Sequence, residues 1–112
     1  MKKLFLCLMM LSFAATALAH SPTHIEVSFN RETKILAAKI IHTVENPSTH
    51  YIDKVEVYLN GSRILTHEIS RQDTENEQVV LYLIPDAKTG DELSVKAYCS
   101  FTGEKEKKIK IE

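Results

Sequence analysis

Cys99 is the most informative residue of this chain, because it is expected to be the single cysteine of the mature protein. The sequence holds two cysteines, and the other one, Cys7, lies in an N-terminal segment with the features of a secretory signal. Without a second thiol, Cys99 cannot form a disulfide within the mature chain, even in an oxidising compartment. Such a thiol is either buried as a small hydrophobe or held as a thiolate by a metal ion. The choice between these two states decides the function.

Residues 1–19 predict a cleaved export signal. Lys2 and Lys3 form its charged start, the segment 4–11 is almost wholly apolar, and small residues at 17 and 19 suit signal peptidase. We therefore expect one mature domain over residues 20–112, periplasmic or secreted, with no membrane attachment after cleavage. A chain of about 93 residues is long enough for one hydrophobic core.

The charge balance of the mature chain excludes one class of partner. Loss of Lys2 and Lys3 leaves 12 basic against 15 acidic residues, a net charge of about −3 with neutral histidines. Nucleic-acid binding needs a basic face, so we expect no nucleic-acid partner. Hydrolase chemistry also has no support, because no Ser-His-Asp order, phosphate-binding glycine loop or carboxylate-pair motif is present.

Two histidines are candidates to bind one metal ion together with Cys99. Cys99 stands near the far end of an apolar alternation over 93–101, which Phe101 completes, and His42 stands at the end of another over 36–42. His50 follows a proline loop and precedes a strand-like segment. If these strand ends share one rim of the fold, two imidazoles and one thiolate form a donor set that suits iron, copper or zinc. The competing interpretation is a buried cysteine and two solvated histidines.

Short alternations of apolar and polar residues recur over the mature region, and none has the period of a long helix. In the segment 79–83 we expect Val79, Leu81 and Leu83 to face the core. The polar stretch Arg71 to Glu77 predicts an exposed connection, and Asn60-Gly61 predicts a type I′ hairpin turn. The expected strands fall within 25–29, 36–44, 55–59, 64–69, 79–83, 93–101 and 109–111. Seven short strands predict an all-β, immunoglobulin-like antiparallel β-sandwich.

Three segments resemble the iron-binding domain of the desulfoferrodoxin and superoxide reductase family, and they occur in the family's order. Residues 46–57 are similar to the segment that reads His-Pro, then His-Trp-Ile or His-His-Ile and an alternating strand. Residues 97–103 resemble the closing Tyr-Cys-Asn-x-His-Gly. Residues 20–26 resemble, more loosely, the opening His-Val-Pro-Val-Ile-Glu. The family's iron domain is an immunoglobulin-like sandwich, in agreement with the strand pattern.

The resemblance implies a mononuclear iron with four histidine nitrogens in a plane, a cysteine sulfur on the axis and an open sixth position. Carried over, Cys99 is the axial ligand and His50 matches the histidine before the aromatic-Ile pair. His20 matches the opening histidine. His42 matches the histidine of His-Pro if two residues are inserted before His50; otherwise Asn46 occupies that place.

The activity implied by the resemblance is the one-electron reduction of superoxide by ferrous iron, or electron transfer. The implied partners are superoxide, as a small-molecule substrate, or a redox partner protein. The sequence departs from the family pattern at Thr102, which stands where the family has a histidine ligand. The family's Glu-Lys pair before the opening histidine is also absent.

Two other functions stay open at this point. Cleavage before His20 would give that residue an amino and an imidazole nitrogen, a pair that suits Cu(II), as in exported copper carriers that begin with histidine. His24 could add a ligand to such a site. Alternatively, the domain is a metal-free interaction module that binds partners through loops or edge strands. The lysine-rich end, 104–112, is most simply a solvated edge strand.

Overall fold

The strands predicted from the alternation are present and make up the whole architecture. The computed structural model describes residues 20–112, so the predicted signal segment, 1–19 with Cys7, lies outside the described residues. Over residues 20–112, no helix is long and apolar enough to cross a membrane. The strands are β1 (His24–Asn30), β2 (Ile35–Ile41), β3 (Ile52–Leu59), β4 (Ser62–Glu68), β5 (Glu77–Leu83), β6 (Glu92–Cys99) and β7 (Glu104–Lys110).

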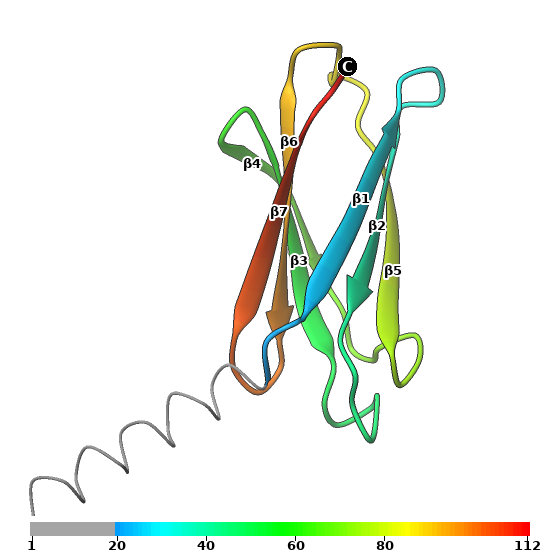
Figure 1. The fold of residues 1–112 in the computed structure, drawn as a ribbon, viewed down its shortest axis with the longest axis vertical. Coiled ribbons are helices and arrows are strands. Elements are labelled where there is room, and N and C mark those ends of the chain that lie inside the picture. The colour runs from blue at the N-terminus through cyan, green and yellow to red at the C-terminus, as the bar shows by residue number, and fades with distance from the viewer. Residues whose placement is uncertain (1–19) are drawn as a thin grey trace, which may run out of the picture.

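These seven strands form two packed antiparallel sheets (Figure 1). One sheet has the order β1-β2-β5, and the other has the order β4-β3-β6-β7. In an immunoglobulin constant domain the fourth strand belongs to the first sheet, whereas here β4 pairs with β3. The prediction of an all-β, immunoglobulin-like sandwich is confirmed.

The connection between β3 and β4 is the predicted tight hairpin. Asn60 and Gly61 alone separate the two strands, and their φ angles are 49° and 84°. Two consecutive positive φ angles are the signature of a type I′ turn, which asparagine and glycine adopt at low cost.

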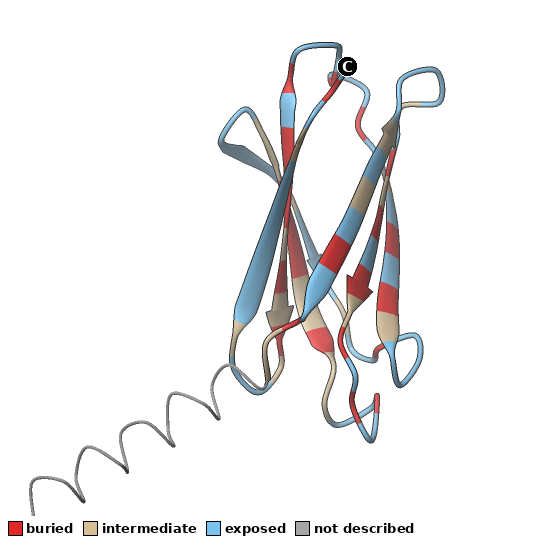
Figure 2. Cartoon of the chain, in the orientation of Figure 1, coloured by how far each residue is buried: buried red, intermediate tan, exposed pale blue. Residues whose placement is uncertain are grey.

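The core lies between the sheets, where buried bands on the strands face one another (Figure 2). Leu93, Val95 and Ala97 on β6 are fully buried. Because side chains on a strand alternate between faces, Cys99 continues this inward row to the end of β6. The other buried apolar side chains of this core are Ile25, Leu36, Ala38, Ile40, Ile52, Val55, Val57, Val80, Ile84, Ala87 and Ile111.

The prediction for the inward face of β5 was wrong. Val79, Leu81 and Leu83 are 42%, 67% and 65% exposed, whereas Val80 is buried. The segment is a continuous apolar run, in which periodicity cannot choose a face. The register decides instead: Val80 lies opposite Ala38 of β2, which is itself inward, and directly paired residues share a face of the sheet.

Glu56 joins three strands on the outer face of the larger sheet. Its buried carboxylate accepts hydrogen bonds from the hydroxyls of Tyr98 and Tyr58 and from the guanidinium of Arg63. The Tyr98 bond is the largest cause of a pKa for Glu56 below its ordinary value of 4.5; burial opposes it, and Arg63 and Tyr58 also lower the pKa. This network braces β3 and β6, the strands that flank the candidate site.

The substitution Glu56→Gln should destabilise the protein most at neutral pH. A carboxyl group with a lowered pKa in the folded state stabilises the fold above its unfolded pKa, and this contribution is lost as the pH falls through the folded value. The difference in unfolding free energy between wild type and variant should therefore shrink below about pH 4.5. Urea unfolding at a series of pH values measures it; a difference that stays constant with pH would contradict the role given to the ionised carboxylate.

Candidate metal centre

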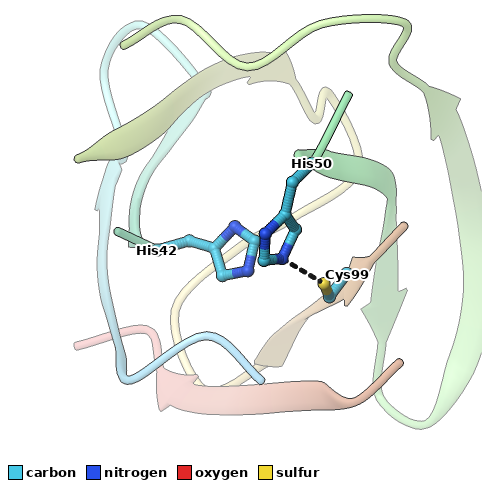
Figure 3. Close-up of side chains that lie close together, drawn as sticks. All are labelled: His42, His50 and Cys99. Carbon is cyan, nitrogen blue, oxygen red and sulfur yellow. Dashed lines mark hydrogen bonds between the residues drawn. The ribbon is translucent and has the colours of Figure 1, made fainter. Parts of the chain in front are cut away.

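Three strand ends bring the predicted ligands to one end of the sandwich, opposite the β3–β4 hairpin (Figure 1). His42 follows the last residue of β2, His50 precedes β3, and Cys99 ends β6. The pairing of Ile52 with Cys99 places the start of β3 beside the end of β6. Their side chains point toward one another (Figure 3). The structure thus brings together the three residues that the sequence singled out.

The spacing of the three side chains is close to that of a coordination sphere. One ligand atom from each of His42, His50 and Cys99 lies within 4.8 Å of the others. Nε2 of His50 is 3.2 Å from Sγ of Cys99. Bonds of roughly 2.1 Å from nitrogen and 2.3 Å from sulfur to one ion allow a separation of up to about 4.4 Å between the two ligand atoms. A single ion could therefore bridge this pair with little movement.

His20 lies beside this group, next to His50 and Phe101. Its ring centroid is 5.3 Å from that of His50 and 5.3 Å from that of Phe101. Its carbonyl oxygen is 3.0 Å from Nε2 of His42. Nδ1 of His20 is buried and has no hydrogen-bond partner among residues 20–112. A buried polar atom without a partner is uncommon and calls for an explanation, which ligation of a metal would supply.

A short turn presents the His50 ring to the cluster. The carbonyl of Asn46 accepts the backbone N–H of His50 at 2.9 Å, and the Phe101 ring stacks on the imidazole with centroids 4.1 Å apart. Burial, followed by the nearby His42 and His20, holds the pKa of His50 below its ordinary value of 6.5. Neutral imidazole is the form that binds metals, so the environment prepares His50 for ligation.

The sulfur of Cys99 is not surrounded by aliphatic groups alone. It is buried, faces the His50 imidazole, and accepts the backbone N–H of Phe101 at 3.4 Å. Hydrogen bonds to a metal-bound sulfur tune its donor strength. The backbone N–H of Cys99 in turn donates to the carbonyl of Gly103 at 3.0 Å, which closes the turn after β6.

Gly103 holds this turn against the segment that carries His20. Its φ is +94°, and a Cβ placed on it would lie 2.9 Å from the Cα of Ser21. Gly90 has the same φ but would meet nothing within 4 Å. The two glycines therefore share the same conformational demand and differ in their contacts.

We expect Gly103→Ala to destabilise the protein more than Gly90→Ala does. Both variants should lose about 1–2 kcal/mol through left-handed backbone strain. Gly103→Ala should lose more, because the backbone of Ser21 must move, and it should also weaken metal binding by displacing His20. Denaturant unfolding and metal titration of the two variants measure these effects. Equal losses in stability and unchanged metal affinity in both would contradict the proposed link between this turn and the site.

Two residues at the site were missed by the sequence analysis. Gln72 was placed in an exposed connection over 71–77, but it is 1% exposed and contacts His42. Phe101 was expected to continue the inward row of β6, but the strand ends at Cys99, and Phe101 is 58% exposed over the His50 ring. No local signal distinguishes Gln72 from its polar neighbours. The stacking of Phe101 depends on a partner about 50 positions away.

Other residues considered from the sequence lie outside the group. His24, the optional copper ligand, is exposed at the first position of β1, with Nε2 3.9 Å from a carboxylate oxygen of Glu26. Thr102 is exposed in the turn after β6. The four-histidine plane implied by the resemblance is therefore represented by three imidazoles at most: His20, His42 and His50.

The fold has known counterparts, although the sequence as a whole does not. No protein-family model and no curated protein matches this sequence. Superoxide reductase (1Fe-SOR) from Giardia intestinalis superposes with a TM-score of 0.59 at 20% identity, over 82% of this chain and 97% of that chain. A superoxide reductase in the oxidised state gives 0.55 at 18% identity, over 82% and 90% of the two chains. A variant neelaredoxin from Archaeoglobus fulgidus, in the reduced form, gives 0.52 at 14% identity, over 82% and 91%. The chain thus has a superoxide reductase-like fold.

Proposed function

We propose that this chain, whose fold resembles that of the superoxide reductases, is an exported protein that binds one iron ion and reduces superoxide or transfers electrons. The proposed ligands are Cys99, His50 and His42, with His20 as a fourth. The single observation that carries the proposal is the gathering of His42, His50 and Cys99, whose donor atoms lie within 4.8 Å of one another, at one end of this sandwich.

The donor set fits iron on chemical grounds. A thiolate with neutral imidazoles suits iron, copper or zinc, and the geometry by itself does not choose among them. The fold neighbours are superoxide reductases, which favours iron. The unpartnered Nδ1 of His20 adds a further nitrogen beside the group. With Thr102 in place of a histidine, the protein offers fewer ligands than the family pattern, which leaves room for a small substrate.

When bound, ferrous iron would supply one electron to superoxide, which with two protons becomes hydrogen peroxide while the iron becomes ferric. The thiolate of Cys99 would donate electron density and favour this one-electron step. His50 and His42 would hold the ion, and the Phe101 ring covers one face of the His50 imidazole. A redox partner protein would return the electron in each cycle.

A groove next to Cys99 carries charges of both signs. It has a volume of about 650 Å³, and its lining includes one cation, Lys54, and two carboxylates, Asp53 and Glu68, besides Tyr51, Ile69, Ser70, Tyr98 and Cys99. The Lys54 ammonium lies 4.2 Å from the centroid of the Tyr98 ring, inside this groove. The two carboxylates outnumber this cation, so the groove gives no net electrostatic attraction to a small anion such as superoxide.

The proposal is tested by loading the mature protein, which begins at His20, with ferrous iron without oxygen. We expect about one iron per chain, and on oxidation a visible charge-transfer band from the ferric–thiolate bond. Addition of superoxide to the ferrous protein should produce the same band together with peroxide. Bound iron without that band would contradict ligation by Cys99.

The same preparation distinguishes the alternatives. Preferential binding of Cu(II) that is lost when one residue is added before His20 would support the copper-carrier interpretation instead. A chain with no affinity for iron, copper or zinc would leave the metal-free interaction module as the function.

A further inference from the structure

Gln72 is a fully buried glutamine whose side chain contacts four other groups at the candidate metal centre. Its Nε2 donates to the carbonyl oxygens of His42 at 2.7 Å and Thr74 at 2.9 Å. Its Oε1 accepts the backbone N–H of Ile52 at 3.1 Å and lies 2.8 Å from Nδ1 of His42. Its backbone N–H donates to the carbonyl of Pro47, in the loop that leads to His50. A single side chain thus connects the segments that carry two of the proposed ligands.

The backbone groups around Gln72 fix which way its amide points. An exchange of the amide oxygen and nitrogen would set the oxygen against two carbonyl oxygens and the NH₂ group against the N–H of Ile52. All three contacts would become repulsive, so Oε1 must face Ile52 and His42. Oε1 can only accept, and so can the carbonyl oxygen of His20 at Nε2, so a neutral His42 ring can donate to one of them. The shorter contact, 2.8 Å against 3.0 Å, favours the proton on Nδ1.

We propose that Gln72 is a positioning residue that holds the proton of His42 on Nδ1 and so reserves Nε2 as the ligand atom. This inference rests on the proposed function for the ligand role of His42. In a neutral imidazole with a proton on Nδ1, Nε2 carries the lone pair. Nε2 itself lies 3.0 Å from the carbonyl oxygen of His20, which is another acceptor. A cation bound at Nε2 would remove the repulsion between the Nε2 lone pair and the carbonyl oxygen of His20.

The choice of tautomer has a direct consequence for affinity. An imidazole whose proton sits on the wrong nitrogen must shift that proton before it can bind a metal. Partners that fix the ring and tautomer of a metal-bound histidine typically contribute 10–100-fold to metal affinity. Gln72 should contribute on this scale without touching the metal.

The first test is nuclear magnetic resonance of the metal-free mature protein, with long-range ¹H–¹⁵N correlations of the His42 ring at about pH 8, above the ordinary imidazole pKa. We expect the proton on Nδ1 in the wild type. A proton on Nε2 would overturn the inference, whatever metal the protein binds.

The second test is Gln72→Met, which keeps the length of the side chain and removes all of its hydrogen bonds. We expect the His42 proton to redistribute between the two nitrogens and the affinity for Fe(II), or for Co(II) as a probe, to fall about 10–100-fold. The matched control is Gln78→Met. Gln78 is also buried and braces the same loop by accepting the N–H of Asp73, but it makes no hydrogen bond to His42. This control should lose stability and keep metal affinity.

The outcomes separate the two proposals. Wild-type protein that binds iron, with equal affinity in Gln72→Met, would overturn the role of Gln72 and leave the proposed function standing. Wild-type protein that binds no metal would overturn the proposed function and the ligand role of Nε2, and the tautomer measurement would still decide whether Gln72 fixes the ring. If Gln72→Met does not fold, the wild-type measurement keeps the inference falsifiable.

Discussion

Replacement of Cys99 by serine should abolish the ferric–thiolate absorption band and most of the iron binding. Serine keeps the size of the side chain, but its hydroxyl is a poor ligand for iron in place of a thiolate. The side chain ends an inward row and lies beside the His50 imidazole, so no neighbouring sulfur can replace it within residues 20–112. Metal analysis and absorption spectra of the iron-loaded variant measure both losses.

The stability of the same variant provides the control. A metal that binds only the folded state stabilises it by about 2.7 kcal/mol at a free concentration 100 times the dissociation constant. Iron should therefore raise the unfolding free energy of the wild type by about this amount and leave Cys99→Ser unchanged. The metal-free stabilities of the two proteins should be similar, because the substitution is nearly isosteric. Equal iron content in both proteins would show that Cys99 is not a ligand of the iron.

The substitution His50→Gln should lower the affinity for iron by at least about 100-fold. Outer partners of metal ligands already contribute 10–100-fold, so loss of a direct ligand should reach or exceed the upper end of that range. Nε2 of His50 lies 3.2 Å from the sulfur of Cys99. Isothermal titration without oxygen, with Fe(II) or Co(II), gives the change in affinity.

His24→Gln is the matched control for this experiment. His24 is exposed, begins β1 at the same end of the sandwich, and lies outside the His42, His50 and Cys99 group. We expect it to bind iron like the wild type. A loss in His24→Gln with none in His50→Gln would reverse the assignment. Such a result would favour a site built on the N-terminal segment, as the copper interpretation requires.

The Cys99→Ser variant also separates iron binding from copper binding. A copper site formed by the amino and imidazole nitrogens of His20 would not need the thiol of Cys99. Copper affinity that survives Cys99→Ser, in a protein whose iron binding does not, would show two independent modes of binding at this end of the sandwich.

The sequence by itself determined the strands, the hairpin and the type of sheet packing, because these depend on local patterns. Alternation with period two places side chains on the two faces of a strand, and Asn60-Gly61 favours the positive φ angles of a tight turn. The same local pattern placed His42 at the end of one inward row and Cys99 near the end of another. Their position at a rim, and their suitability as ligands, could therefore be predicted.

Tertiary structure alone decided the inward face of β5, the burial of Gln72 and the contact between His50 and Cys99. Each of these depends on residues that are far apart in the chain. The face of β5 follows from its register with β2, since its apolar run has no periodicity of its own. The burial of Gln72 follows from carbonyls and an N–H on three other segments that must be satisfied away from water. The distance of 3.2 Å between His50 and Cys99 exists only once β3 and β6 pair. Local patterns predict which side chains face inward. Only the packing of the strands determines which residues those side chains contact.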